Sequence, residues 1–310
     1  MPRASPSSVL ENGAAHLQLT PGGVQALRVF ARGAPLPAGP TPSSSAFCDG
    51  EGLERAFASS SNPIILQRFV EFCAVPAGGV VIEVGAGTGR LTFEGGLADA
   101  VRGGLLLATD PSAPMLRILE RKRDEHAANH VHILVAPAEH LPVASGGAAA
   151  VLGSKFLQYA DATVAIEEMM RAAAPGGIIA VLDSSGVELS PAWQRIVQPL
   201  VTAARSAERA CRSNLHAPGE VAALFRRAGL QDVGVGQLED RVFTPNYATT
   251  ARGLTQVSFL EGFVADLPLA EQNTLVSRAY RDLEAVFAET GPQDRFMTAQ
   301  YQMVRGRLPG

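Results

Sequence analysis

The sequence predicts an α/β protein built on a doubly wound, mostly parallel β-sheet. Three observations support this prediction: short apolar runs recur along the chain, helix-compatible segments separate most of them, and a glycine-rich turn directly follows the first run. The strands of a parallel sheet are buried on both faces, so they read as continuous apolar runs rather than as alternating patterns. With 310 residues, the chain suits one elaborated domain or one core domain with an appendage.

The N-terminal part of the chain lacks this pattern. We expect residues 1–60 to form an extension that is partly disordered and contains helical segments, because proline, glycine and serine are frequent there. Residues 17–30 allow one short helix. Helical spacing resumes over residues 51–73, and Asn62, followed by proline, suits a helix start. Residues 61–310 then form the main domain.

The main domain contains seven predicted strands, which share short length and enrichment in apolar and β-branched residues. They are residues 80–84, 105–110, 132–136, 148–153, 176–183, 231–238 and 296–305. Helices are expected between or after them, at residues 90–101, 112–127, 161–174, 191–211 and 218–230. Residues 186–215 and 240–296 are long for connections in a compact sheet, so we expect them to be helical cap elements that shape a binding site.

The composition excludes several classes of function. Lys and Arg number 26 against 30 Asp and Glu, a net charge of −4, which disfavours nucleic acid as a partner. No apolar run reaches the ~18 residues of a membrane span, and the N-terminus lacks the apolar core of a secretory signal. Cys48, Cys73 and Cys211 form no disulfide framework, and His130 and His132 have no further ligands nearby, so we expect a cytoplasmic protein without a metal site.

The sharpest motif is the turn EVGAGTGR at Glu83–Arg90. Glycine allows a ligand to approach the backbone closely and adopts positive φ at little cost. A helix starting at this turn would direct its N–H groups and positive dipole end at the same crevice. Asp110 ends the second predicted strand, 21 residues after Gly89. A carboxylate at this position can accept hydrogen bonds from ribose hydroxyls, so the pair predicts a ribose-bearing cofactor.

The pattern GxGxG has Arg90 where the dinucleotide fingerprint has its third glycine, which argues against an NAD(P)-dependent oxidoreductase. With Glu83 two residues before the first glycine, it resembles motif I of the class I S-adenosylmethionine (SAM)-dependent methyltransferases. Further segments resemble the family's other motifs in the same order: Asp110–Leu116, Ala136–Pro142 and Ile166–Gly177. The resemblance is closest to the type 11 group, which includes quinone-biosynthesis methyltransferases. It implies a Rossmann-like, seven-stranded sheet whose last strand is antiparallel.

The resemblance also implies which residues bind SAM. The methionine part is expected to lie against Gly85, Gly87 and Gly89, with its ammonium group near Glu83. The ribose is expected to meet Asp110, and the sulfonium to face Ser154. The adenine is expected to meet Met115 and the backbone at Ala138 and Glu139. One position departs from the family, which often has an adenine-contacting Asp where this chain has Pro137.

The expected reaction is methyl transfer to a small organic acceptor, such as a quinone, polyketide, terpenoid or other specialised metabolite. Carbon, oxygen and nitrogen acceptors stay open, as does the oligomeric state. A general base is needed only for a poorly nucleophilic acceptor, and the candidates are His140 and His216, with Tyr159 and Asp183 behind them. The alternatives are a protein that binds SAM without methyl transfer and, more remotely, the NAD(P)-dependent oxidoreductase.

Overall fold

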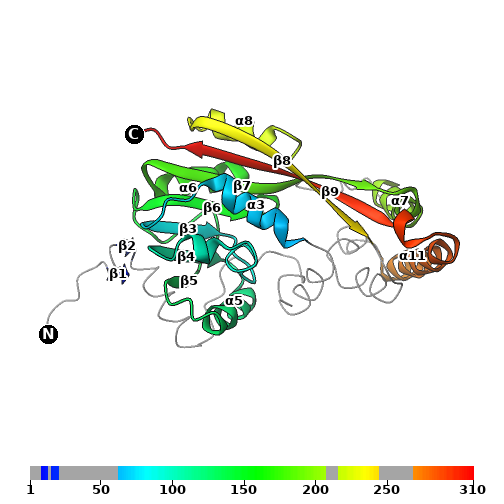
Figure 1. Ribbon diagram of the computed structural model, residues 1–310. Helices are drawn as coiled ribbons and strands as arrows, with labels where there is room; N and C mark the ends of the chain where they lie inside the picture. The colour runs from blue at the N-terminus through cyan, green and yellow to red at the C-terminus, as the bar shows by residue number, and fades with distance from the viewer. Residues whose placement is uncertain (1–7, 13–14, 21–61, 207–215, 244–267) are drawn as a thin grey trace.

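A computed structural model of the chain describes residues 8–12, 15–20, 62–206, 216–243 and 268–310 (Figure 1). In this part of the chain, the main sheet has seven strands in the order β5-β4-β3-β6-β7-β9-β8. The strands are β3 Val80–Val84, β4 Leu105–Asp110, β5 Val131–Val135, β6 Ala148–Ser154, β7 Ala173–Leu189, β8 Gln231–Phe243 and β9 Phe296–Arg307. β9 runs antiparallel to both neighbours, and the pairs among β3 to β7 are parallel, so the predicted fold class is confirmed.

Helices cover both faces of the sheet. They are α3 Pro63–Cys73, α4 Leu97–Ala100, α5 Ala113–Glu125, α6 Ala162–Ala172 and α8 Glu220–Arg227. α3, α4 and α5 pack on one face, where Phe69, Leu97 and Leu119 join one core cluster. α6 and α8 pack on the other, where Met169 and Phe225 join a second cluster. Because successive strand residues point to opposite faces, the continuous apolar runs supply both clusters.

The start of α3 follows the prediction from Asn62. The Asn62 side chain accepts a hydrogen bond from the N–H of Ile64 at 3.1 Å, which satisfies one of the free donors of the first turn. Pro63 occupies that turn, where its missing N–H costs nothing. This cap fixes where α3 begins on the face of the sheet that it covers together with α4 and α5.

One predicted helix is largely wrong. Residues 90–101 were expected to be helical, but only α4, Leu97–Ala100, is, and the chain from Gly87 to Gly95 forms consecutive turns. Gly96, with φ +79°, directly precedes α4, so the regular helix begins only at Leu97. The glycine-rich turn therefore does not lead directly into a regular helix.

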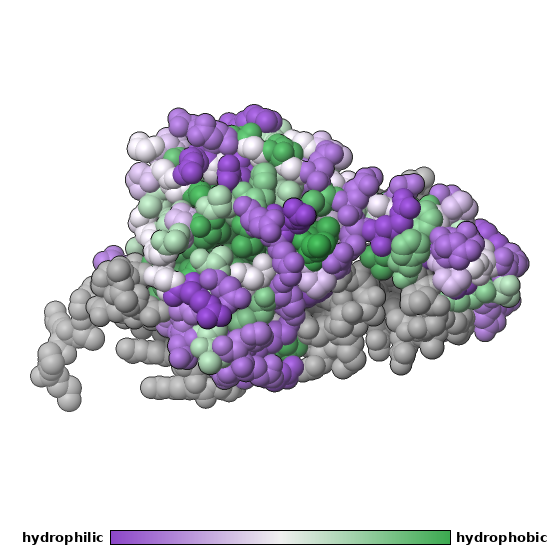
Figure 2. Space-filling view, in the orientation of Figure 1, coloured by the Kyte–Doolittle hydropathy of each residue, from purple (hydrophilic) through white to green (hydrophobic). Residues whose placement is uncertain are grey.

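Two strands, β7 and β8, extend well beyond their predicted ends and, together with β9, carry a helical lobe. β7 continues past Asp183 to Leu189, which pairs with Met297 of β9, and Phe243 of β8 pairs with Phe296. α7, Pro191–Ser206, and α11, Leu269–Glu289, pack together at the far end of these strands (Figure 1). Their shared core is apolar, and its members are Ala192, Trp193, Ile196, Val197, Ala279, Leu283 and Val286. Figure 2 shows a mainly hydrophilic outer end on this lobe.

The predicted insertion at residues 240–296 therefore starts later than expected, because residues up to Phe243 belong to β8. Strand pairing between distant segments lengthened these strands, and no apolar run marked it. Residues 244–267 lie outside the described part of the chain.

The N-terminal extension contains a hairpin that the sequence pattern did not predict. β1 Ser8–Asn12 pairs antiparallel with β2 Ala15–Leu19, so the start of the helix expected at 17–30 is a strand. Leu19 is buried in the main core, and the N–H of Thr20 donates to the carbonyl oxygen of Pro142 at 2.9 Å. The hairpin is thus tied to the loop that follows β5. Among the described residues, no helix is long and apolar enough to cross a bilayer.

Candidate active site

The sequence-predicted cofactor residues gather at one edge of the sheet. β3, β4, β6 and the first part of β7 are parallel, so their carboxyl ends meet there. The glycine-rich turn follows β3, Asp110 ends β4 and Ser154 ends β6. In doubly wound sheets, ligands bind outside the carboxyl ends of the strands. This edge is therefore the candidate site.

The three glycines of the turn have different roles. All have positive φ, +68° at Gly85, +54° at Gly87 and +83° at Gly89. A Cβ at Gly85 would overlap the Cβ of Phe156, and one at Gly89 would lie 2.9 Å from Cγ of Leu119. At these two positions the absence of a Cβ therefore makes room for neighbouring protein side chains.

Gly87 is the glycine with room beside it. Among the described residues, the atom that a Cβ there would meet within 4 Å is Sδ of Met115, at an ordinary contact distance of 3.7 Å. Met115 itself is buried at the start of α5. Met115, which the sequence predicts to contact the cofactor, thus lies beside Gly87.

Asp110 is fixed by backbone donors on both sides. Its Oδ2 accepts from the N–H of Gly87 at 2.9 Å, and its Oδ1 accepts from the N–H of Ser112 at 2.8 Å. The side chain is 8% exposed. Burial raises the pKa of Asp110 to about 6, and the two N–H bonds limit the rise. Each carboxylate oxygen keeps a further lone pair, so Asp110 can still accept bonds from two vicinal hydroxyls.

Glu83 lies on β3, one residue before the carboxyl end of this strand, and it is fully buried. Its Oε2 accepts from the hydroxyl of Thr92 at 2.6 Å. Burial raises the pKa of Glu83 to about 8, and the charges of Asp110 and Glu94 add to the rise. A ligand ammonium group nearby would favour the ionised carboxylate, because an opposite charge offsets the loss of hydration. Glu83 therefore suits a cationic ligand group.

The remaining predicted cofactor residues follow β5 and β6. Ala138 is buried and Ser154 is half-buried. The Glu139 carboxylate accepts from the N–H of Asp161 at 2.9 Å, and Asp161 caps the start of α6. The side chain of Glu139 thus ties two loops together. Pro137 is half-buried and offers no side-chain acceptor.

The two candidate bases are in very different surroundings. His140 is exposed on the loop after β5. His216 is only 14% exposed, and its Nδ1 lies 2.7 Å from Oδ2 of Asp183, whose side chain is fully buried. The bond to Asp183 raises the pKa of His216. The sequence suggested His216 and Asp183 as separate candidates. The fold brings these two side chains together although they lie 33 positions apart in the chain.

Lys155 is a feature of this edge that sequence reasoning did not assign. It follows Ser154 with φ +57°, an uncommon backbone conformation for a residue with a side chain. Its Nζ lies 4.6 Å from the centre of the Tyr301 ring and 3.5 Å from the Tyr301 hydroxyl. Burial lowers the pKa of Lys155 to about 8, and the charge of Arg90 adds to this effect. Since Tyr301 comes from β9, no local sequence signal could have identified the contact.

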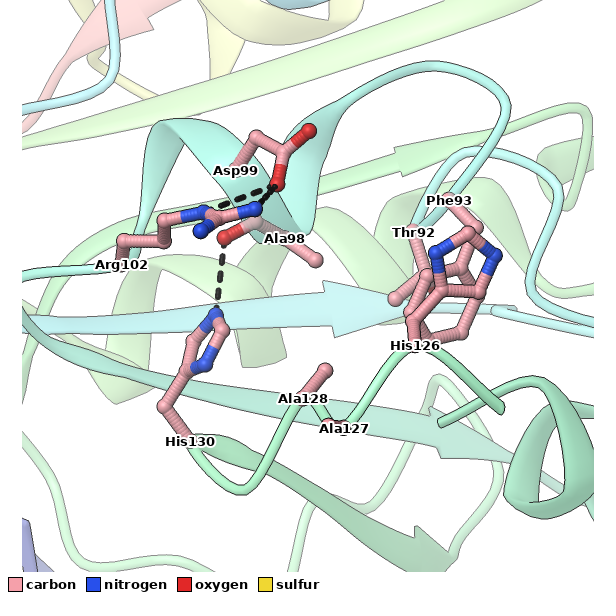
Figure 3. A pocket seen from close by; sticks show the side chains of 9 residues that line it. All are labelled: Thr92, Phe93, Ala98, Asp99, Arg102, His126, Ala127, Ala128 and His130. Carbon is pink, nitrogen blue, oxygen red and sulfur yellow. Dashed lines mark hydrogen bonds and ion pairs between the residues drawn. The ribbon is translucent and has the colours of Figure 1, made fainter. Parts of the chain in front are cut away.

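A separate hollow of about 160 Å³ lies near the amino ends of β4 and β5 (Figure 3). Its lining combines polar, aromatic and alanine side chains: Thr92, Phe93, Ala98, Asp99, Arg102, His126, Ala127, Ala128 and His130. The ring of His126 stacks on Phe93, and Nε2 of His130 lies 2.8 Å from the carbonyl oxygen of Ala98. None of the predicted cofactor residues lines it. No cluster of three potential metal ligands occurs in the described ranges.

Comparisons with known proteins bear on the same segment. Residues 81–177 match the family described as a methyltransferase domain. No curated protein matches the sequence. Among solved structures, a candidate methyltransferase of Bacillus halodurans is 14% identical over 79% of this chain and 99% of its own, with a TM-score of 0.53. The YcgJ protein of Bacillus subtilis is 14% identical over 80% and 100% of the two chains, with a TM-score of 0.52.

A third similar structure contains ligands. Phosphoethanolamine N-methyltransferase 2 of Haemonchus contortus, solved with phosphomonomethylethanolamine and S-adenosylhomocysteine (SAH), is 16% identical, covers 98% of this chain and 72% of its own, and has a TM-score of 0.52. At these identities the likeness shows the fold. Residues 81–177 thus match the methyltransferase domain family, and the seven-stranded sheet has the α/β Rossmann-like methyltransferase fold.

Proposed function

We propose that this protein is an enzyme that transfers the sulfonium methyl group of SAM to a small organic acceptor. The observation that carries the proposal is the pairing of Gly87 with Asp110. The turn leaves space beside a bare backbone, and the N–H of that same glycine holds a buried carboxylate at the tip of the next strand. This arrangement suits a ligand with a compact polar end joined to a ribose.

The chain's residues fit SAM at several points. Gly87 leaves room for the methionine part, and Gly85 and Gly89 shape the turn around it. The Glu83 carboxylate suits the ammonium group, and Asp110 suits the ribose hydroxyls. The other predicted contacts are Met115, Ala138, the Glu139 backbone and Ser154. When bound, SAM supplies a methyl group already activated by its positively charged sulfur. The protein's task is then to orient the acceptor and exclude water.

The acceptor side is built from the long strands and their lobe. β7, β8 and β9 extend beyond the other strands to the apolar core of α7 and α11. The net charge of −4 does not favour nucleic acid. The Haemonchus contortus enzyme carries a small phosphomonoester ligand on the same fold. These points support a small molecule, such as a quinone, polyketide, terpenoid or other specialised metabolite, with a carbon, oxygen or nitrogen acceptor atom.

Two measurements test the proposal. Titration calorimetry should show SAH binding by the wild-type chain, and methyl-labelled SAM should transfer label to at least one member of a panel of phenols, quinols, 1,3-dicarbonyl compounds and amines. Binding without transfer to any acceptor would favour a SAM-binding protein that does not methylate. Thermal stabilisation by NADH and not by SAH would favour the oxidoreductase and would refute the proposal.

A further inference from the structure

We infer that Asp183 and His216 form a proton-accepting pair for the methyl acceptor, and that the acceptor therefore reacts through an atom that must lose a proton. The substrate class is a phenol, an enol or an enolisable carbon acid. This inference rests on the proposed function and deepens it. It stands on the geometry of the pair, the way its histidine is held, and its position at the edge of the sheet.

The pair has the geometry of a base and its orienting carboxylate. Nδ1 of His216 and Oδ2 of Asp183 are 2.7 Å apart, and the Asp183 side chain is 0% exposed. A carboxylate bound to Nδ1 keeps the proton on that nitrogen, which leaves the Nε2 lone pair as the basic site. Within the described part of the chain, no hydrogen bond to Nε2 is found.

The backbone of His216 is held by a buried amide. Nε2 of Gln302 donates to the carbonyl oxygens of His216 at 3.1 Å and Ala217 at 3.3 Å. Its Oε1 accepts from the N–H of Gly219 at 3.1 Å, and the residue is 1% exposed. Gln302 thus attaches the segment before α8 to β9. In the strand register, Gln302 itself pairs with Asp183 of β7. Asp183 of β7 thus holds the ring of His216 and Gln302 of β9 holds its backbone, as pre-organised acid–base groups require.

The position of the pair matches that of the reacting atoms. In the register, Val84 of β3, Gly153 of β6 and Val181 of β7 lie side by side, so Asp183 lies just beyond the carboxyl edge. Two strand spacings separate β3 from β7, roughly 10 Å. Ser154, which the family resemblance places by the sulfonium, ends the strand between them. An acceptor lying over β6 can therefore reach both the methyl group and His216.

The charges around the pair are suited to proton uptake. The groups that act on His216 are Asp183 on β7 and Glu220 on α8, both acidic, and both raise its pKa. Oδ1 of Asp183 is buried and has no hydrogen-bond partner in the described ranges, so the carboxylate has capacity for a further donor at this edge.

The step balances as follows. The O–H or C–H bond of the acceptor breaks, and its proton moves to Nε2 of His216. The electron pair left on the acceptor forms the new bond to the methyl carbon, while the carbon–sulfur bond breaks and its pair stays on sulfur. The products are the methylated acceptor, SAH and a protonated His216, which releases its proton to solvent.

The first test measures the pair directly and needs no acceptor. Proton NMR titration of the histidine C2–H signals should give His216 a pKa above the ordinary histidine value, and Asp183→Asn should lower it. His126→Gln identifies a control signal, because His126 is exposed beyond α5 and contacts Phe93 instead. An unchanged His216 pKa in folded Asp183→Asn would overturn the inference.

The second test measures turnover with methyl-labelled SAM on matched phenol and aniline acceptors and on a 1,3-dicarbonyl compound. Transfer should favour the phenol or the dicarbonyl compound, with kcat rising as His216 loses its proton. His216→Gln should lower kcat by about 10²–10⁴-fold while SAH affinity stays constant, and Asp183→Asn should shift the pH profile to lower pH. His126→Gln should match the wild type.

The two failures are distinguishable. If SAH binds and label is transferred, but His216→Gln retains wild-type kcat or anilines are the sole acceptors, the inference is overturned and the proposed function stands. If SAH does not bind, the proposed function itself fails, and the inference fails with it.

Discussion

The different roles of Gly85 and Gly87 make the sharpest prediction, because the same substitution should have different consequences at two positions two residues apart. In Gly85→Ala, the new Cβ overlaps the Cβ of Phe156, whereas in Gly87→Ala its one contact with the described residues is Sδ of Met115 at 3.7 Å. Both backbones have positive φ, +68° and +54°. The stability of the fold should therefore depend on Gly85, and ligand binding should depend on Gly87.

The magnitudes follow from two costs. A side chain in the left-handed region costs roughly 1–2 kcal/mol of unfolding free energy, and both variants incur this. Overpacking a filled site adds roughly 1–3 kcal/mol, which only Gly85→Ala incurs, because Phe156 is 6% exposed and cannot move away freely. We expect Gly85→Ala to lose about 2–5 kcal/mol and Gly87→Ala about 1–2 kcal/mol.

The assay pairs denaturant unfolding, followed by far-ultraviolet circular dichroism, with SAH titration calorimetry. Gly87→Ala should remain folded and bind SAH at least about tenfold more weakly, which corresponds to about 1.4 kcal/mol. Gly85→Ala is the matched control for backbone strain. Equal destabilisation of the two variants, or wild-type SAH affinity in folded Gly87→Ala, would refute the reasoning.

Three further predictions concern the carboxylates and the lobe. Asp110→Asn should weaken SAH binding by about 1.5–3 kcal/mol, because a hydrogen bond to a charged acceptor is lost; an unchanged calorimetric affinity would remove Asp110 from the ribose site. SAH affinity should rise from pH 6.5 to 8, because Glu83, with a pKa of about 8, must release its proton to pair with the ammonium group, and Glu83→Gln should lack this rise; equal pH dependence in both proteins would contradict it. Leu283→Ala should cost about 2–5 kcal/mol and speed amide exchange in α7 and α11, since Leu283 is fully buried in the lobe core; lost SAH binding would show instead that the lobe supports the cofactor site.

Much of the sheet was predictable because its signals are local. The mainly apolar runs at Val80–Val84 and Leu105–Asp110 gave strands with these bounds, since a strand buried on both faces is largely apolar. The same holds for the turn, where positive φ favours glycine, and for Asp110, which its position at the end of β4 places beside the turn. Fold class and the place of the candidate cofactor site follow from residues close together in the chain.

The tertiary structure decided which residues meet. Gly85 faces Phe156, Lys155 lies over Tyr301, and His216 bonds Asp183, and in each case the partner lies on another element. Likewise, β7 runs on to Leu189 because β9 pairs with it, and no apolar run marks residues 184–189. Such contacts depend on which distant segments the folded backbone brings together, so a local pattern carries no record of them. Local sequence therefore predicts the candidate cofactor site. The contact between Asp183 and His216, in contrast, forms only when the sheet is assembled.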